Sequence, residues 1–173
     1  MVEFLLHRNT DLVIGLFPRH MERIGAWQQL LTRKKIPFIL RSQLTEAVDH
    51  STVILWDTIG ELQEGYSRAN ATFVGGSLAP LGGQNFLEPL AAGLQPVIGK
   101  FWSNFYWVGE KIFKNNLVIR VNTWQEAADV LLNNLNDQPD PEKIRELFVQ
   151  YAERYRGGTR TACAEIHRLL ALN

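Results

Sequence analysis

Residues Ala71 to Glu88 read ATFVGGSLAPLGGQNFLE, and this stretch decides the class of fold. Its first four residues are β-branched or apolar and end at a glycine pair, which is typical of a short buried strand. Asn85 opens a helical pattern that Gly93 and Pro96 close, because a glycine suits a left-handed helix end and proline cannot continue the helix. A strand, a glycine-rich turn and a helix in this order indicate an α/β protein.

The rest of the chain repeats this alternation. Six short runs rich in Val, Ile, Leu and Phe are predicted strands: Leu12–Phe17, Phe38–Arg41, Val53–Trp56, Ala71–Val74, Pro96–Ile98 and Leu117–Val121. Helical patterns separate them at Met21–Lys35, Ile59–Arg68, Phe86–Gly93, Phe105–Asn115 and Thr123–Leu135. Strands that are apolar on both faces suit a buried parallel sheet. The sequence therefore predicts a Rossmann-like parallel sheet with helices on both faces.

The two ends of the chain depart from this alternation. After a turn-rich break at residues 136–141, two helices are expected at about Glu142–Arg156 and Thr159–Leu172, with no strand beyond them. At the other end, Met1–Arg8 reads as the last turns of a helix without a visible cap. We therefore expect residues 1–173 to be a single domain that lacks its upstream part and ends in two helices.

Composition narrows the class of function. Hydrophobic residues make up 46%, and 18 acidic residues balance 18 basic ones, so no basic excess points to nucleic acid. Cys163 is the only cysteine; it excludes an internal disulfide and reads as a small buried group in a protein of a reducing compartment. No apolar run or leader predicts a membrane span or secretion, and the four histidines lack metal-ligand spacing. We expect a cytoplasmic protein without a metal.

In an open parallel sheet, ligands bind beyond the carboxyl ends of the strands. After the first predicted strand come Arg19 and His20, and the Arg19 guanidinium can hold a phosphate, although taken alone this motif is better explained by a surface arginine near a helix start. After the third, Thr58 and Glu61 predict a capping box. Gly60 between them leaves room for a ligand at free helix amides.

The segment Gly75 to Glu88 follows the fourth predicted strand. Its two glycine pairs cost chain entropy, which a close backbone approach to a ligand would justify. Asn85 and Glu88 again fit a capping pattern, and the Glu88 carboxylate could accept hydrogen bonds from both hydroxyls of a ribose. Pro89 predicts an irregular helix start. After the fifth strand, the aromatics of residues 99–105 either line a pocket mouth or cover the core.

The ordered motifs resemble the bacterial Kdo transferases, which move 3-deoxy-D-manno-octulosonic acid (Kdo) from CMP-Kdo to a lipid A precursor. The sequence has no phosphate-binding P-loop, no Gly-x-Gly-x-x-Gly turn after a strand and no nucleophile elbow, so none of these motifs supports a different interpretation. The agreement covers about Leu12 to Val121. It rests on Phe17-Pro18-Arg19-His20 with Glu22-Arg23, Arg41-Ser42, Asp57-Thr58-Ile59-Gly60-Glu61-Leu62, Phe73-Val74-Gly75-Gly76-Ser77-Leu78, Gly82-Gly83-Gln84-Asn85-Phe86-Leu87-Glu88 and Asn104-Phe105.

The resemblance implies the C-terminal, donor-binding half of a two-domain GT-B glycosyltransferase. The first strand of that half and the N-terminal acceptor domain are then expected to be missing. The family's catalytic base and membrane-associating segment lie on that domain, so no catalytic residue is expected on this chain and the chain alone should be inactive. The implied donor is CMP-Kdo, with no cofactor or metal. The implied place is the cytoplasmic face of the inner membrane.

The resemblance also assigns residues. Arg19 would contact the CMP phosphate, Ile59 and Gly60 the cytosine, and Glu88 the ribose. Asn85 would bind the phosphate or sugar. The remaining expected site residues are the floor formed by Gly75, Gly76 and Ser77, and the possible lining residues His20, Gln84 and Asn104.

This chain departs from the family pattern in four places. Gln84 stands where histidine is usual and Phe86 where proline is usual; Lys100 and Asn70 replace a common Pro and Asp. An amide cannot titrate, so an acid role at position 84 would be lost while a hydrogen bond would remain. Two alternatives stay open: a GT-B enzyme that uses a UDP-sugar, and a noncatalytic nucleotide- or sugar-binding module.

Overall fold

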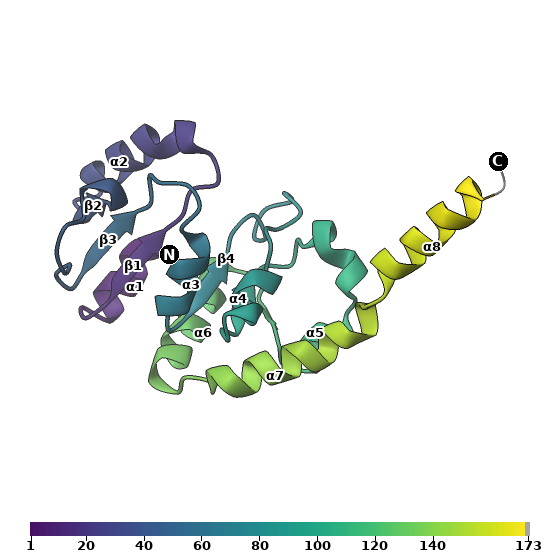
Figure 1. Ribbon diagram of the computed structural model, residues 1–173. Helices are drawn as coiled ribbons and strands as arrows, with labels where there is room; N and C mark the ends of the chain where they lie inside the picture. The colour runs from purple at the N-terminus through teal and green to yellow at the C-terminus, as the bar shows by residue number, and fades with distance from the viewer. Residues whose placement is uncertain (172–173) are drawn as a thin grey trace.

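The computed structural model describes residues 1–171 and shows strands alternating with helices (Figure 1). The strands are β1 (Val13–Leu16), β2 (Phe38–Leu40), β3 (Thr52–Leu55), β4 (Thr72–Val74), β5 (Pro96–Ile98) and β6 (Ile119–Arg120). The helices are α1 (Val2–Arg8), α2 (Ile24–Arg33), α3 (Leu62–Arg68), α4 (Leu87–Ala91), α5 (Lys111–Lys114), α6 (Trp124–Asn136), α7 (Pro141–Ala152) and α8 (Gly158–Leu170). Short 3-10 turns lie at η1 (Met21–Arg23), η2 (Arg41–Gln43), η3 (Ser103–Val108) and η4 (Glu153–Tyr155).

All strand pairs are parallel, as predicted, but they form two three-stranded sheets with the orders β1-β3-β2 and β4-β5-β6. No ladder joins β1 to β4 within residues 1–171. The two sheets still share one core, because Ile14 of β1 packs in the same cluster as Phe73 and Val97 of the second sheet. The register pairs Leu16 with Leu55 in the first sheet. The loops that follow β1 and β3 therefore leave that sheet at the same edge.

Helices cover both faces of the second sheet, which confirms the prediction. Val97 of β5 is fully buried with Ala127 of α6. Its neighbour Ile98 points the other way, into a cluster with Leu90 of α4 and Ile144 of α7. Alternation along a strand thus places successive side chains in different layers.

Two predicted helices differ from the observed ones at glycines. The helix expected at Phe105–Asn115 is divided into η3 and α5, because Gly109 adopts φ 84° and ψ 154°. The helix expected from Ile59 begins only at Leu62, because Gly60 has φ 93°. Neither backbone conformation can continue a right-handed helix.

The terminal helices agree with the sequence prediction. Met1–Arg8 forms α1, which packs against α6, and the chain closes with α7 and α8. Figure 1 shows α8 projecting away from the rest of the molecule, and none of its residues is buried. Cys163 lies on this helix and is exposed, so its predicted burial was wrong. Leu172 of the predicted range falls outside the described residues.

Aromatic residues after β5 close the core. Trp102 is 4% exposed, and Phe105 packs against the same cluster. Trp102 meets Phe86 edge-on, with ring centroids 6.4 Å apart. Of the two alternatives for this loop, the cover over the core is therefore the observed one. Within residues 1–171, no helix is both long and apolar enough to cross a bilayer.

Candidate functional site

The glycine-rich segment after β4 folds back on itself. The amide of Gly83 donates to the carbonyl of Gly76 at 2.8 Å, and the amide of Gln84 donates to the carbonyl of Gly75 at 3.0 Å. These two bonds bring the two glycine pairs side by side. The residues that the sequence singled out between 75 and 88 thus form one compact loop at the carboxyl end of β4.

Ser77 joins this loop to the one after β5. Its side chain is 1% exposed; the hydroxyl donates to the carbonyl of Val74 at 2.6 Å and accepts from the amide of Gly99 at 2.8 Å. The amide of Phe101 donates to the carbonyl of Ser77 at 2.9 Å. The hydroxyl thus uses both its donor and its acceptor function inside the protein. Ser77 therefore contributes to the floor of the loop through its backbone rather than through its hydroxyl.

The second glycine pair is required by the protein itself. Gly82 and Gly83 have φ values of 82° and 76°, where other residues are strained. A Cβ at Gly82 would lie 2.5 Å from Oδ1 of Asn104, and one at Gly83 would lie 3.2 Å from the carbonyl of Phe101. Close approach explains this pair, but the approaching group belongs to the same chain rather than to a ligand.

Asn104 fastens the second glycine pair. Its amide donates to the carbonyl of Gly82 at 3.0 Å, and its side-chain Nδ2 donates to the carbonyl of Gly83 at 3.1 Å. The side chain that the sequence interpretation placed along the site is therefore engaged in holding the loop.

The first glycine pair is different. Gly76 needs its φ of 70°, but Gly75 lies outside the positive-φ region. A Cβ built on Gly75 would meet nothing closer than 3.9 Å, at Oε1 of Gln84. Nothing within the described chain requires glycine at position 75. Because Gly75 is partly exposed and carries no side chain, its backbone is accessible beside the Gln84 amide, where a ligand could approach.

Helix α4 starts at Leu87, and its N-cap Phe86 makes no side-chain cap bond. Asn85 Oδ1 accepts a hydrogen bond from the amide of Leu87 at 3.0 Å, but Asn85 lies one residue before the N-cap, so it shapes the turn into the helix and the cap predicted at Asn85 is not formed. The other half of the capping box is wrong, because Glu88 Oε1 accepts from Asn85 Nδ2 at 2.7 Å instead of from a backbone amide. Pro89 supplies no amide to this short helix. Within residues 1–171, Glu88 Oε2 has no hydrogen-bond donor, and the Glu88 side chain is exposed.

The loop after β3 holds a carboxylate hub at Glu61. Instead of capping the helix, Glu61 Oε2 accepts from Thr58 Oγ1 at 2.9 Å, so the capping box predicted here is wrong. The same oxygen accepts from Trp56 Nε1 at 2.9 Å and from Arg41 Nε at 3.0 Å. The Thr58 hydrogen bond, followed by those of Trp56 and Arg41, lowers the pKa of Glu61 against the raising effect of burial.

A second carboxylate ties the ends of β2 and β3. Asp57 Oδ1 accepts from the amide of Ser42 at 2.8 Å, and its Oδ2 accepts from the Ser42 hydroxyl. Burial alone would raise the pKa of Asp57, but these hydrogen bonds outweigh burial and lower it. Sequence reasoning missed this pairing and the Arg41–Glu61 contact. The signal in the sequence that could have revealed both contacts was that Arg41-Ser42 and Trp56-Asp57 follow two neighbouring strands.

An aromatic stack supports the same edge. The rings of Phe17 and Trp56 stack with centroids 4.0 Å apart, and the Arg41 guanidinium lies 5.8 Å from the Trp56 ring centre. Beyond this stack the loop reaches solvent, since Ile59 is 84% exposed and a Cβ at Gly60 would meet nothing within 4 Å. The loop therefore presents its backbone outward from a rigid base.

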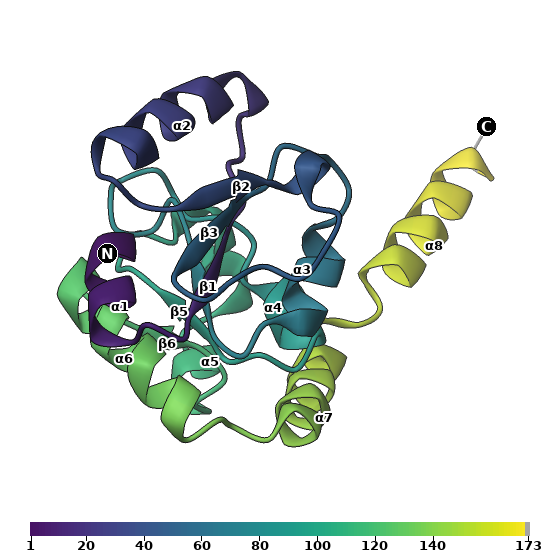
Figure 2. The ribbon, with the colours of Figure 1, turned by 90° about the vertical axis from the view of Figure 1, so that its left-hand side faces the viewer.

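The helices that follow these two loops are neighbours. Helix α3, which follows Ile59 and Gly60, contacts α4, which follows Asn85 (Figure 2). Burial and the nearby carboxylate of Glu88 raise the pKa of Tyr66, on α3, to about 12. The base-side and ribose-side residues named by the sequence therefore come from adjacent segments.

Arg19 and His20 stand apart from these loops. They occupy the exposed connection between β1 and η1, where His20 Nδ1 lies 3.2 Å from Glu22 Oε1. This connection leaves the carboxyl end of β1, the same edge at which the Glu61 hub lies. Within residues 1–171, no hydrogen bond joins Arg19 to the loops after β4 or β5.

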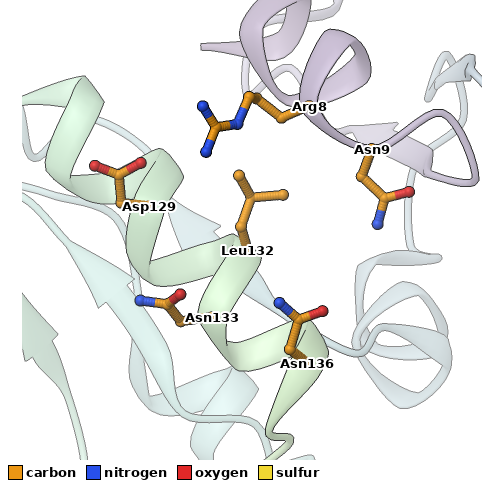
Figure 3. Close-up of a pocket in the computed structure, with 6 residues that line it drawn as sticks. All are labelled: Arg8, Asn9, Asp129, Leu132, Asn133 and Asn136. Carbon is orange, nitrogen blue, oxygen red and sulfur yellow. The ribbon is translucent and has the colours of Figure 1, made fainter.

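The pocket in Figure 3 lies elsewhere. This hollow of about 390 Å³ sits between the end of α1 and the face of α6. It is lined by Arg8, Asn9, Asp129, Leu132, Asn133 and Asn136. Asn9 precedes β1, so the hollow belongs to the amino-terminal edge of the strands, opposite the candidate site. In the described residues 1–171, no three His, Cys, Asp or Glu side chains cluster as metal ligands.

Comparison with known proteins gives the arrangement a context. No family model matches the chain. A solved structure, the C-terminal CMP-Kdo binding domain of WaaA from Acinetobacter baumannii, superposes with a TM-score of 0.75 over 90% of this chain and 80% of that one, at 29% identity. This chain is related to the Kdo transferases. Its parallel α/β fold and its closing helices match that C-terminal domain.

Curated Kdo transferases agree with the structural match. The 3-deoxy-D-manno-octulosonic acid transferase of Haemophilus influenzae is 37% identical over 134 residues, which cover 75% of this chain and 31% of that protein. The enzyme of the same name from Bordetella pertussis is 30% identical over 149 residues, covering 86% of this chain and 35% of that protein. The chain thus spans about a third of the length of these Kdo transferase relatives.

Proposed function

We propose that this chain is the donor-binding part of a glycosyltransferase that takes Kdo from CMP-Kdo. The observation that carries the proposal is the partly exposed backbone at Gly75, next to the Gln84 side chain, in the loop that leads to the exposed Glu88 carboxylate. This loop follows the carboxyl end of β4, and α/β proteins bind ligands beyond the carboxyl ends of their strands. The solved relative is named as a CMP-Kdo binding domain, which supports the identity of the ligand.

Each part of the nucleotide has a matching group in this proposal. The free Oε2 of Glu88 accepts hydrogen bonds from the ribose hydroxyls. Ile59 and Gly60 meet the cytosine with their outward backbone, and Arg19 folds over the phosphate as a bidentate donor. Asn85 binds the phosphate or sugar with its second Nδ2 hydrogen. The floor is formed by the backbone of residues 75–77, and His20 and Gln84 complete the rim.

The rest of the reaction lies outside this chain in the proposal. A lipid A precursor is the acceptor in lipopolysaccharide synthesis, and an N-terminal domain at the cytoplasmic face of the inner membrane supplies the catalytic base. Transfer needs no metal or other cofactor, and nucleic acid is not a partner. The chain alone is expected to be inactive, so transfer by residues 1–173 without an added acceptor domain would contradict this division of roles.

The donor assignment is tested by isothermal titration of the chain with CMP and UMP, with and without EDTA. We expect CMP to bind at least about tenfold more tightly than UMP. EDTA should change neither affinity. The variant Glu88→Gln should lose CMP binding, because an amide replaces the carboxylate that accepts from the ribose, while Glu142→Gln on α7 serves as a matched exposed control. Equal affinity for UMP would favour a UDP-sugar enzyme, and no binding of either would favour a module without this nucleotide site.

A further inference from the structure

We infer that Glu61 is a positioning residue that holds the Ile59-Gly60 turn in the shape that receives the nucleotide base. The inference rests on the proposed function but concerns a residue to which that function assigns no contact with the ligand. Glu61 acts through Thr58 and through the strand ends behind the turn.

Three side chains donate hydrogen bonds to one oxygen of Glu61. Oε2 accepts from Arg41 Nε at 3.0 Å and Trp56 Nε1 at 2.9 Å, which lie directly after β2 and β3. It also accepts from Thr58 Oγ1 at 2.9 Å, in the residue just before the turn. One of these partners is a cation, and hydrogen bonds to charged groups are stronger than neutral ones.

The turn itself has few other restraints. Ile59 is 84% exposed, and Gly60 takes a φ of 93° with nothing within 4 Å of its Cβ position. The turn is therefore held at Thr58 on one side and at Glu61 on the other. The two ends are joined directly, because the carboxylate of Glu61, the residue that follows Gly60, accepts the hydrogen bond from Thr58.

A turn that offers backbone groups to a base gains affinity when it is ordered before binding, because ordering then costs nothing at the moment of association. The Phe17–Trp56 stack and the Asp57–Ser42 bonds make the base of the turn rigid. Glu61 extends that rigidity to the exposed residues. Its carboxylate is thus placed to set nucleotide affinity without touching the nucleotide.

The test uses Glu61→Ala, Glu61→Gln and the control Glu64→Gln. Glu64 is an acid on α3, the helix that begins directly after Glu61; it also pairs with an arginine, Arg68 at 2.9 Å, but it has no contact with the hub. Backbone order parameters at Ile59 and Gly60 are measured by NMR relaxation without ligand, and CMP affinity is measured by titration. Circular dichroism and thermal unfolding confirm that each variant is folded.

We expect Glu61→Ala to lower the order parameters at both amides and to weaken CMP binding about tenfold, the scale of one lost charged hydrogen bond. Glu61→Gln keeps an acceptor for Trp56 and Thr58, so it should restore part of both properties. Glu64→Gln should change neither. Unchanged order parameters in Glu61→Ala, or unchanged CMP affinity with lower order parameters, would overturn the positioning role.

The failure of the proposed function would be seen separately, as no binding of CMP by the unaltered protein. The order parameters at Ile59 and Gly60 would then still decide whether Glu61 holds the turn. Should Glu61→Ala not fold, Thr58→Val removes only the hydroxyl donor next to the turn. This variant should show lower order parameters at the same two amides, and unchanged values would overturn the inference.

Discussion

The hydroxyl of Ser77 accepts a hydrogen bond from the amide of Gly99 at 2.8 Å and thereby fixes the loop after β4 to the loop after β5. The two residues are so close that a Cβ on Gly99 would lie 2.2 Å from the carbonyl oxygen of Ser77. The candidate site therefore depends on a contact between two backbones that only glycine permits.

Removal of the Ser77 hydroxyl should destabilise the protein. Ser77→Ala leaves the buried Gly99 amide without its acceptor, so we expect a loss of about 1–3 kcal/mol in the free energy of unfolding, measured by urea denaturation. The control is Ser67→Ala, whose exposed hydroxyl donates to the Glu64 carbonyl at 2.8 Å. Equal midpoints for the two variants would contradict the role given to Ser77.

The two glycine pairs should respond differently to alanine. Gly75→Ala should fold normally but weaken CMP binding, because the added methyl touches Gln84 only at ordinary van der Waals distance but covers the backbone that the ligand would approach. Gly82→Ala should lower stability by at least about 1 kcal/mol, since φ of 82° is strained for alanine and Asn104 is in the way. Thermal unfolding and CMP titration of both variants separate the effects. A strongly destabilised Gly75→Ala would show that the fold, not a ligand, needs that glycine.

The end of α4 gives a prediction independent of any ligand. Gly93 has φ 88°, and a Cβ there would lie 2.5 Å from Arg145 Nη1 and 2.6 Å from the Pro141 carbonyl. Gly93→Ala should therefore destabilise the protein by about 1–3 kcal/mol in chemical denaturation. The control Gly25→Ala, inside α2 with nothing within 4 Å, should instead be neutral or stabilising by up to about 1 kcal/mol. A tolerated Gly93→Ala would mean that α7 docks against α4 differently.

Asp57 should make stability depend on pH. Its folded pKa lies below the ordinary value of 3.8, so its contribution is fully present above that value and is lost as the pH falls through the lower, folded pKa. The difference in unfolding free energy between the protein and Asp57→Asn should thus be largest near neutral pH and shrink under acid. Ser42→Ala removes one donor to Asp57 and should reduce this pH dependence. A difference that stays constant with pH would contradict the pairing of Asp57 with Ser42.

The sequence alone determined the parallel α/β fold, because short runs that are apolar on both faces can be buried only between layers of helices. Every predicted strand was found, and the ordered motifs indicated the relationship to Kdo transferases that the comparisons support. The sequence also singled out Asn85 at the approach to α4, where its side chain bonds to an amide only two residues further on. Local patterns of this kind need no knowledge of distant contacts.

Only the tertiary structure decided what each glycine and carboxylate does. Gly75 and Gly82 look alike in sequence, but a side chain at Gly75 would only touch Gln84 at ordinary distance, whereas one at Gly82 would collide with Asn104, twenty-odd residues further along the chain. Glu61 fits a capping pattern, yet it bonds to Arg41 and Trp56 because β2 and β3 end side by side. Spacing along a chain cannot reveal which distant donors or side chains the fold brings within hydrogen-bond distance.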